Sequence, residues 1–203
     1  MSPPLYGLVL AGGRSTRMRR DKAALAYHGR TQLDWAMELL APQVAQAFVS
    51  VRADQLDDPV RARFPAIVDR EEDLGPVAGI RAAQDTHPEA AWLVLACDLP
   101  FLGAGTLERL LQARRPGEPA LAYRSSHDGL PEPLCAVYEP SSRPLLAGYV
   151  AGGGRCPRKF LLRIGARLLD PVDPRALDNV NTPDEYGAVL ARLAADAPEA
   201  LER

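Results

Sequence analysis

Glycines and basic side chains are concentrated in one stretch near the start of the chain, LAGGRSTRMRRDK, which runs from Leu10 to Lys22. The adjacent Gly12 and Gly13 allow a sharp turn and a close approach to a ligand, because neither residue carries a Cβ. Backbone N–H groups in such a turn can surround an anion, and arginine and lysine side chains can neutralise a polyphosphate. The stretch therefore predicts a phosphate-binding loop, with a glycine turn that carries surface arginines as the alternative.

The stretch matches neither of the two best-known phosphate loops. A Walker loop has the pattern G-x-x-x-x-G-K-[ST], whereas here the two glycines are adjacent and Lys22 is followed by Ala23. The dinucleotide pattern G-x-G-x-x-G is also absent. What remains is an apolar run, a glycine pair and then basic residues, among them Arg17 and Lys22.

A carboxylate follows the most apolar run of the sequence. Asp98, in LVLACDLP, comes just after the expected buried strand Ala91–Ala96. Magnesium prefers one or two carboxylates together with substrate phosphates and water, so Asp98 is a candidate magnesium ligand. The alternative is an Asx turn or a helix cap. Asp69 follows the short apolar run Ala66–Val68 and could reach the same edge, or it could be a solvated acid.

A second glycine motif, DLGPVAGI, contains Gly75, Pro76 and Gly79 at the start of an expected helix. Without Cβ atoms, the backbone there could approach a flat nucleotide base. The alternative is a turn that leads into a well-packed helix.

Other kinds of catalytic chemistry are poorly supported. The three histidines, His28, His87 and His127, form no H-x-x-x-H or H-E-x-x-H pair, and no G-x-S-x-G motif occurs. The cysteines are odd in number and form no C-x-x-C pair, so neither a zinc cluster nor a disulfide framework is expected. Cys97 is expected to be a small buried apolar residue.

The elements that must position these residues alternate between strands and helices. Apolar spacing from Leu33 to Ala47 indicates one helix face, within which Pro42 should kink or end the helix. Thr182 and Glu185 form a capping box that opens a last helix to about Leu193. The pattern predicts a Rossmann-like, three-layer α/β/α fold with a mainly parallel sheet. Strands are expected at Leu5–Leu10, Ala47–Val51, Ala66–Val68, Ala91–Ala96 and Leu134–Tyr138, and further helices at Val77–Gln84 and Leu107–Leu111.

Length and charge limit the remaining possibilities. The chain has 203 residues and a net charge of −2, which favours one domain, expected over 1–195 with a frayed tail at 196–203. The charge does not favour nucleic acid as a partner. The sequence shows no signal peptide and no apolar run long enough to cross a membrane, so a cytoplasmic protein is expected.

Five motifs together resemble one family. In chain order they are LAGGRSTRM…DK, DLGPVAGI, CDLP, EPLCAVY and NVNTPDE. This set resembles the MobA-type molybdenum cofactor guanylyltransferases of the nucleotidyltransferase superfamily. The resemblance extends from Leu5 to about Leu193, which is nearly the whole chain.

The resemblance implies a nucleotide-binding α/β enzyme that uses GTP and Mg²⁺. Such an enzyme transfers GMP to the terminal phosphate of a molybdopterin cofactor and releases pyrophosphate, and a molybdoenzyme chaperone is a possible partner. Carried over by position, Arg17, Lys22 and Asp98 would be catalytic, with Asp98 holding the metal, and Asn179 and Asn181 would lie on the cofactor or metal side. The nucleotide would be bound by Leu10, Ala11, Gly12, Gly13, Lys22, Asp69, Gly75, Pro76, Gly79 and Asp98.

Three positions depart from the family pattern. Arg19 stands where the family usually has glycine, and Ser50 stands where an asparagine contact is usual. Glu132, in EPLCAVY, has no evident role and could form the edge of the cofactor pocket. A later group of basic residues could receive the anionic pterin phosphate or form a solvated helix face: Arg155, Arg158, Lys159 and Arg163.

Two alternatives remain open at this level. One is a cytidylyltransferase for the same cofactor, although LAGG, rather than LAAG, and GPVAG both favour guanine in this resemblance. The other is a nucleotide-binding module without catalysis that is a partner of a cofactor chaperone. The presence of Lys22 and Asp98 disfavours this second alternative.

Overall fold

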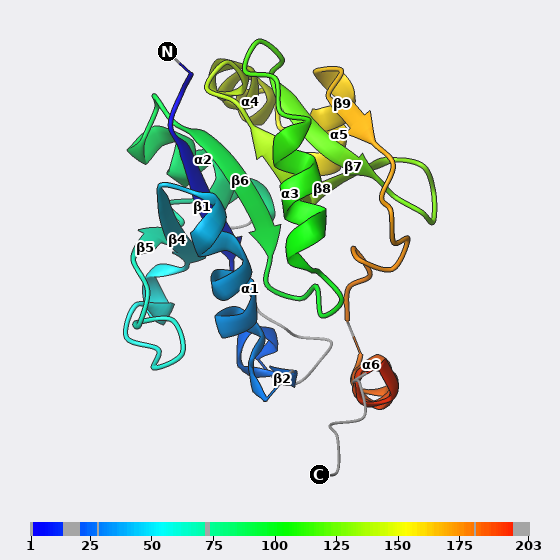
Figure 1. Ribbon diagram of the computed structural model, residues 1–203. Helices are drawn as coiled ribbons and strands as arrows, with labels where there is room; N and C mark the ends of the chain where they lie inside the picture. Colours follow the sequence, from blue (N-terminus) through cyan, green and yellow to red (C-terminus); the bar gives the residue numbers. More distant parts are fainter. Residues whose placement is uncertain (1, 14–20, 28, 72–73, 181, 197–203) are drawn as a thin grey trace.

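A seven-stranded sheet forms the centre of the molecule (Figure 1). The computed structural model describes residues 2–13, 21–27, 29–71, 74–180 and 182–196. The strand order in the sheet is β5-β4-β1-β6-β8-β7-β9. These strands are β1 (Leu5–Leu10), β4 (Gln46–Val51), β5 (Ala66–Val68), β6 (Ala91–Ala96), β7 (Ala120–Arg124), β8 (Pro131–Tyr138) and β9 (Arg167–Leu169).

The sheet is mainly parallel, as the alternation of strands and helices predicts. The strands β5, β4, β1 and β6 run parallel to one another, and β7 runs parallel to β9. The exception is β8, which is antiparallel to both β6 and β7. A short turn joins β7 to β8, with Gly129 at φ 72°, and so short a connection can join only antiparallel strands. The strands β7 and β9 were not predicted from the sequence.

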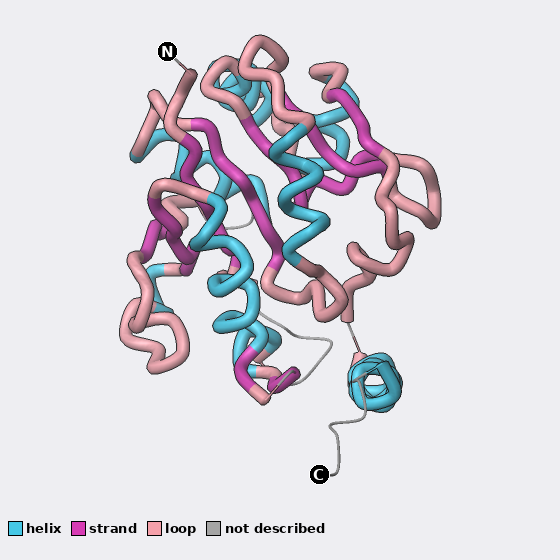
Figure 2. The backbone as a smooth tube through the Cα atoms, in the orientation of Figure 1, coloured by secondary structure: helices cyan, strands magenta, loops and turns pink. Residues whose placement is uncertain are grey.

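Helices cover both faces of the sheet, which confirms the three-layer architecture (Figure 2). On one face, α1 (Gln32–Leu40) and α3 (Ala104–Gln112) pack on side chains such as Val9 and Leu95. On the other face, α2 (Pro76–Thr86), α4 (Ser142–Ala151) and α5 (Pro157–Arg163) pack on side chains such as Leu8 and Val94. Consecutive strand residues point to opposite faces, so β1 and β6, which lie in the middle, are buried on both.

Pro42 ends the first helix, which is one of the two outcomes predicted for it, so the apolar spacing from Leu33 to Ala47 is helical only as far as Leu40. Helix α1 ends at Leu40, and a 3-10 turn over Ala41–Gln43 follows it. Pro42 lies in that turn, where its missing N–H and its ring prevent the α-helix from continuing. Ala47 belongs to β4 instead.

The last helix begins as predicted. Glu185 N donates to Thr182 Oγ1 at 3.3 Å and Thr182 N donates to Glu185 Oε2 at 3.1 Å, which is a capping box. Helix α6 runs over Pro183–Asp196, somewhat beyond the expected end, and the expected tail from 197 onward lies outside the described residues. It packs on a small apolar cluster that includes Tyr27 of the short strand β2 (Ala26–Tyr27), which pairs with β3 (Arg30–Thr31).

The helices were also compared with the length and apolarity that a membrane span requires. Within the part of the chain that the structure describes, no helix is long and apolar enough to cross a bilayer.

Candidate functional site

The two central strands, β1 and β6, end side by side. Leu10 is paired with Ala96, so the residues that follow each strand emerge at one edge of the sheet. In α/β sheets of this kind, ligands bind outside the carboxyl ends of the strands. Lys22 Nζ and Asp98 Oδ2 meet at this edge at 2.6 Å, and both side chains are more than four-fifths buried. The structure therefore brings together two of the three predicted catalytic residues, while the third, Arg17, lies outside the described residues.

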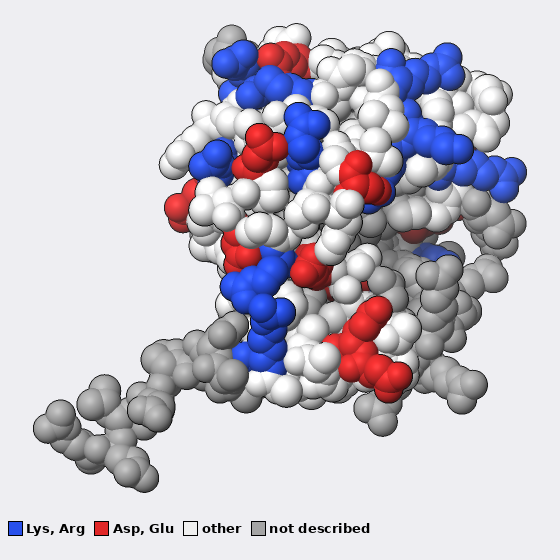
Figure 3. All heavy atoms as spheres, turned by 90° about the vertical axis from the view of Figure 1, so that its right-hand side faces the viewer, with Lys and Arg blue, Asp and Glu red and all other residues white. Residues whose placement is uncertain are grey.

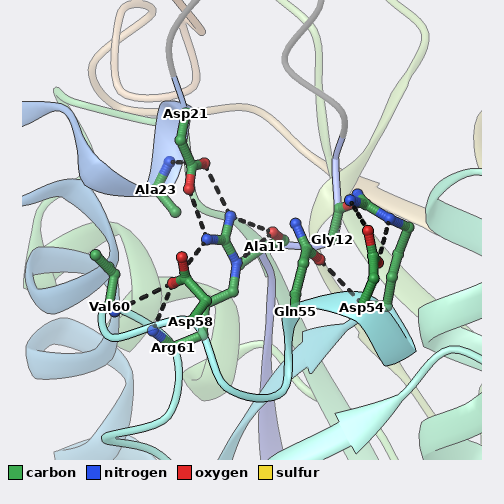
Figure 4. A network of polar contacts seen from close by, with 10 residues as sticks. Ala11, Gly12, Asp21, Ala23, Asp54, Gln55, Asp58, Val60 and Arg61 are labelled. Carbon is green, nitrogen blue, oxygen red and sulfur yellow. Dashed lines mark hydrogen bonds and ion pairs between the residues drawn. The ribbon is translucent and has the colours of Figure 1, made fainter.

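A network around Arg61 holds the end of β1 against the start of the Lys22 turn (Figure 4). The Arg61 side chain is 2% exposed. Its Nε and Nη2 donate to the carbonyl oxygen of Ala11 at 3.0 and 2.8 Å. The same guanidinium donates to Asp21 at 2.6 and 2.8 Å and to Asp58 at 3.0 Å.

Asp21 in turn starts the short 3-10 helix η1 (Lys22–Ala24). Asp21 Oδ1 accepts from Ala23 N at 3.1 Å, so the carboxylate caps the turn that carries Lys22. Burial alone would raise the pKa of Asp21, but the hydrogen bond and charge of Arg61 and the Ala23 N–H together lower it below its usual value. Arg61 thus fixes both ends of the segment from Ala11 to Asp21.

Arg61 is a functional residue of this site that the sequence did not indicate. No motif marks it, and Ala11 and Asp21 lie 50 and 40 residues away from it along the chain. The local signal is its spacing from Asp58, three residues earlier, with which it forms an ion pair.

Gly12 lies beside Asp69, which is one of the predicted nucleotide contacts. A Cβ on Gly12 would stand 3.1 Å from Asp69 Oδ2, and Arg52 Nη1 donates to the Gly12 carbonyl oxygen. The Asp69 carboxylate accepts from Ser50 Oγ at 2.7 Å, and burial raises its pKa. A Cβ on Gly13, in contrast, would meet none of the described residues within 4 Å. A side chain at Gly12 would therefore crowd Asp69, whereas no described residue crowds Gly13.

The second glycine motif opens α2. Gly75, at φ 57°, is the N-cap residue and Pro76 begins the helix. A Cβ on Gly79 would overlap Ser50 Oγ and come within 2.7 Å of Leu10 Cδ2. Because Gly79 has no side chain, α2 can pack closely on the sheet. Contact of this segment with a nucleotide base stays a prediction.

A cavity of about 580 Å³ has one wall that is hydrogen-bonded to Asp98. Val180 N donates to the Asp98 carbonyl oxygen at 3.3 Å, so the segment that forms one cavity wall is joined to the residue at the end of β6. Asn179, predicted to lie on the cofactor or metal side, lines the cavity, and Asn181 lies outside the described residues. The remaining lining is Phe101, Ser125, His127, Asp128, Glu132, Arg158, Leu177, Asp178, Val180, Glu185, Ala188, Val189 and Arg192.

Several charged side chains on the cavity wall contact a side chain of opposite or titratable charge. Arg158 Nη1 is 2.7 Å from Asp128 Oδ2, and Arg158 Nη2 is 3.3 Å from each carboxylate oxygen of Glu132. His127 Nε2 is 2.8 Å from Asp178 Oδ1. Figure 3 shows that both acidic and basic side chains occur on one face of the molecule.

Two of the three cysteines are poorly suited to act as nucleophiles. All three are free thiols, and Cys97 and Cys135 are buried. Burial raises the pKa of each of these two thiols to about 12, which keeps them protonated at neutral pH. The expectation that Cys97 is a buried apolar residue is confirmed.

A glycine turn, a lysine and a carboxylate at the edge of a mainly parallel sheet are typical of nucleotide-binding α/β proteins. A profile of the MobA-like NTP transferase domain matches residues 7–168. The chain belongs to this family.

Curated relatives agree with this assignment. A molybdenum cofactor guanylyltransferase of Ectopseudomonas mendocina is 31% identical over 208 residues, which cover 97% of this chain and 96% of the relative. The guanylyltransferase of Pseudomonas paraeruginosa is 36% identical, with 90% and 92% covered. A molybdenum cofactor biosynthesis bifunctional protein of Synechocystis is 36% identical over 92% of this chain, but the chain spans only 54% of that longer protein.

Solved structures share the fold. The molybdopterin-guanine dinucleotide biosynthesis protein A of Archaeoglobus fulgidus has a TM-score of 0.77 at 24% identity, with 94% of this chain and 99% of that one covered. A nucleotidyl transferase from Methanothermobacter has a TM-score of 0.75 at 18% identity, with 95% and 98% covered. Both likenesses show a common nucleotidyltransferase architecture.

Proposed function

We propose that this protein transfers GMP from GTP to the terminal phosphate of a molybdopterin-type cofactor and releases pyrophosphate. The observation that carries the proposal is the Lys22–Asp98 pair at 2.6 Å. It lies at the edge where β1, the strand before Gly12, ends beside β6, and Asp98 is bonded through Val180 to the wall of the cavity that includes Asn179. A nucleotide on one side and an acceptor on the other would meet at this pair. The guanylyltransferase names of the relatives support GTP as the donor.

In the proposed reaction, an oxygen of the acceptor phosphate forms a bond to the α-phosphorus of GTP. The bond from that phosphorus to the bridging oxygen of the β-phosphate breaks, and pyrophosphate leaves with the electron pair. The attacking oxygen is already anionic, so no general base is required. The main obstacle is the approach of two polyanions, which positioning and charge neutralisation overcome. Lys22 would supply positive charge to the phosphates.

Magnesium fits the donor set at this edge. Among the described residues, no group of three or more His, Cys, Asp or Glu side chains is gathered as a complete metal site. Asp98 is a single carboxylate beside the proposed phosphate position, and Mg²⁺ is usually held by one or two carboxylates plus substrate phosphates and water. When bound, the ion would stabilise negative charge on the α-phosphate and on the leaving pyrophosphate. Lys22 would then transfer its contact from Asp98 to the phosphates.

The remaining assignments stay predictions of this proposal. Asp69 and Gly12 are adjacent to one another at the sheet edge, which supports a shared role in nucleotide binding. Arg17 and Asn181 are included by family position. The proposed nucleotide-binding set is Leu10, Ala11, Gly12, Gly13, Lys22, Asp69, Gly75, Pro76, Gly79 and Asp98, and Asn179 is placed on the acceptor side.

The cellular setting follows from the chemistry. GTP is a cytoplasmic metabolite, so we place the reaction in the cytoplasm. The product would pass to a molybdoenzyme or to its chaperone.

Pyrophosphate release tests the proposal directly. The protein is mixed with Mg²⁺, molybdenum cofactor and each nucleoside triphosphate in turn, and pyrophosphate is measured. Release with GTP alone is expected. Release with CTP alone would replace the proposal with a cytidylyltransferase, and no release with any nucleotide would favour a binding module without catalysis. Omission of the cofactor is the control for simple hydrolysis.

A further inference from the structure

The cavity wall contains a guanidinium–carboxylate pair, Arg158 and Glu132, that the proposed transfer step does not use. Arg158 lies on α5, and Glu132 lies near the start of β8. The guanidinium also binds Asp128, at 2.7 Å, whereas its nitrogen is 3.3 Å from each oxygen of Glu132. Arg158 therefore holds Asp128 closely and Glu132 loosely.

An irregularity in the sheet positions Glu132. Ala122 of β7 is opposite Ala136 of β8, but the next residue, Tyr123, is opposite Glu132. The extra residues on β8 form a bulge between these two pairs. Bulges redirect side chains and are frequent next to binding sites. Here the bulge is adjacent to a carboxylate that lines the cavity.

The carboxylates of the cavity differ in how closely they are held. Asp178 is 2.8 Å from His127, and Glu185 accepts from Thr182 N at 3.1 Å. The 3.3 Å contacts of Glu132 are longer than these, and longer than the usual N–H···O distance of about 2.9–3.0 Å. Glu132 therefore has longer contacts than Asp128, Asp178 or Glu185, and both of its oxygens share one guanidinium nitrogen.

The pterin of the proposed acceptor presents a group that resembles a guanidinium. Its 2-amino-4-oxopyrimidine ring carries the N3–H and the 2-amino N–H side by side, and a carboxylate can accept both at once. We propose that Glu132 recognises this edge of the pterin, with one carboxylate oxygen on each donor, while Arg158 remains bound to Asp128. This inference rests on the proposed function, because it assigns the cavity to the acceptor.

The arrangement of charge would also orient the acceptor. Lys22 lies at the sheet edge beside Asp98, and the cavity wall is joined to Asp98 through the Val180 backbone. The acceptor phosphate would be attracted to Lys22 and repelled by Glu132, whereas the N–H donors of the pterin would be attracted to Glu132. The two ends of the acceptor are thus distinguished by charge.

Two small pteridines, pterin and lumazine, can test the proposal by their binding to the full chain. Pterin carries the 2-amino group, and lumazine carries an oxygen in its place, so lumazine presents an acceptor where pterin presents a donor. Fluorescence titration is expected to show that the wild-type protein binds pterin at least about tenfold more tightly than lumazine, since a site built for a hydrogen-bond donor rejects an analogue that lacks it.

The Glu132→Gln variant is expected to lose this preference. Its amide oxygen can accept from N3–H while its amide nitrogen donates to the lumazine oxygen, so the variant should bind lumazine at least as tightly as pterin. Glu118→Gln is the matched control, because it also removes a carboxylate paired with an arginine, Arg167, but lies outside the cavity lining. This control should retain the wild-type preference.

Two results would overturn the assignment of Glu132: a wild-type protein that does not prefer pterin, or a Glu132→Gln variant that still does. In the transfer assay, Glu132→Gln should raise the KM for the cofactor about tenfold and leave the KM for GTP unchanged. If the wild-type protein transfers no GMP, the proposed function fails, but the pterin titration still decides the role of Glu132. The two failures are therefore distinguishable.

Discussion

Lys22 and Asp98 are 76 positions apart in the sequence, and their side chains meet at 2.6 Å at the carboxyl end of β6. Three features produce this contact. The parallel pairing of β1 with β6 brings the two strand ends together, Asp21 caps the turn that carries Lys22, and Arg61 ties Asp21 to the end of β1.

Replacing Asp98 with alanine is expected to abolish GMP transfer and to leave the fold intact. The loss of the proposed magnesium ligand should lower the rate by at least about 10²–10³-fold, the usual cost of losing one electrostatic partner. Asp98 lies after β6 and outside the hydrophobic cores, so its removal should not disturb packing. Pyrophosphate release measures the rate, and circular dichroism checks the fold. Full activity with ordinary Mg²⁺ would remove Asp98 from the metal site.

Replacing Lys22 with alanine is expected to weaken GTP binding, transfer, or both. An ammonium group that contacts phosphates contributes about 1.5–3 kcal/mol, which corresponds to a loss of roughly tenfold or more in affinity. Titration with a fluorescent GTP analogue measures the affinity. Lys159, which is exposed on α5, provides the control, and Lys159→Ala should bind GTP as the wild type does. Unchanged binding and kinetics in Lys22→Ala would exclude this residue from the site.

Replacing Arg61 with methionine is expected to destabilise the fold by about 1–3 kcal/mol, because Asp21, Asp58 and the carbonyl oxygen of Ala11 lose the hydrogen bonds of the buried guanidinium. Arg61→Lys should be more stable than Arg61→Met but less stable than the wild type. An ammonium group cannot donate to both Ala11 and Asp21 in the geometry of the planar guanidinium. Urea unfolding measures both variants. Arg63→Ala is the control: this side chain is 49% exposed in its ion pair with Asp34, so its loss should cost less than about 1 kcal/mol.

Acid is expected to weaken the contribution of Asp21. Its pKa is lower in the folded protein than the usual value, because the contacts with Arg61 and Ala23 outweigh the effect of burial. The unfolded chain therefore binds this proton more readily. The stabilisation is fully present above the unfolded pKa of about 3.9 and is lost as the pH falls through the lower folded value.

The measurement is the free energy of unfolding of wild type and Asp21→Asn as the pH is lowered from about 6 to about 3. Other carboxylates titrate in both proteins, so the difference between the two isolates Asp21. That difference should be largest near pH 6 and should shrink towards pH 3. A constant difference would show that Arg61 does not stabilise the charged form.

Replacing Gly79 with alanine is expected to destabilise the protein by about 1–3 kcal/mol, the usual cost of overpacking a core. The added Cβ would overlap Ser50 Oγ, which also holds Asp69, so GTP binding should weaken as well. Gly148 of α4 is the matched control, because a Cβ there would meet nothing within 4 Å. Gly148→Ala should stabilise the protein by about 0.5–1 kcal/mol. Equal effects of the two substitutions on thermal unfolding would contradict the packing role of Gly79.

Much of the fold could be predicted because the signals are local. The apolar runs Leu5–Leu10 and Ala91–Ala96 are strands β1 and β6 with the expected bounds, and the Thr182–Glu185 capping box starts α6. The apolar spacing of the first helix continues past Leu40, but Pro42 ends the helix, which is one of the two outcomes that the sequence predicts. A periodic pattern indicates which face is apolar, but backbone chemistry decides where the element ends.

The sequence by itself determined the residue types of the candidate site: a glycine turn, a lysine and two carboxylates that follow strands. Tertiary structure alone decided which of them meet. The Arg61 network, the Ser50–Asp69 hydrogen bond and the Arg158–Glu132 pair join residues that are 19 to 50 positions apart. Contacts of this kind depend on strand order and helix packing, which bring distant segments together, so periodicity and motif spacing carry no signal for them.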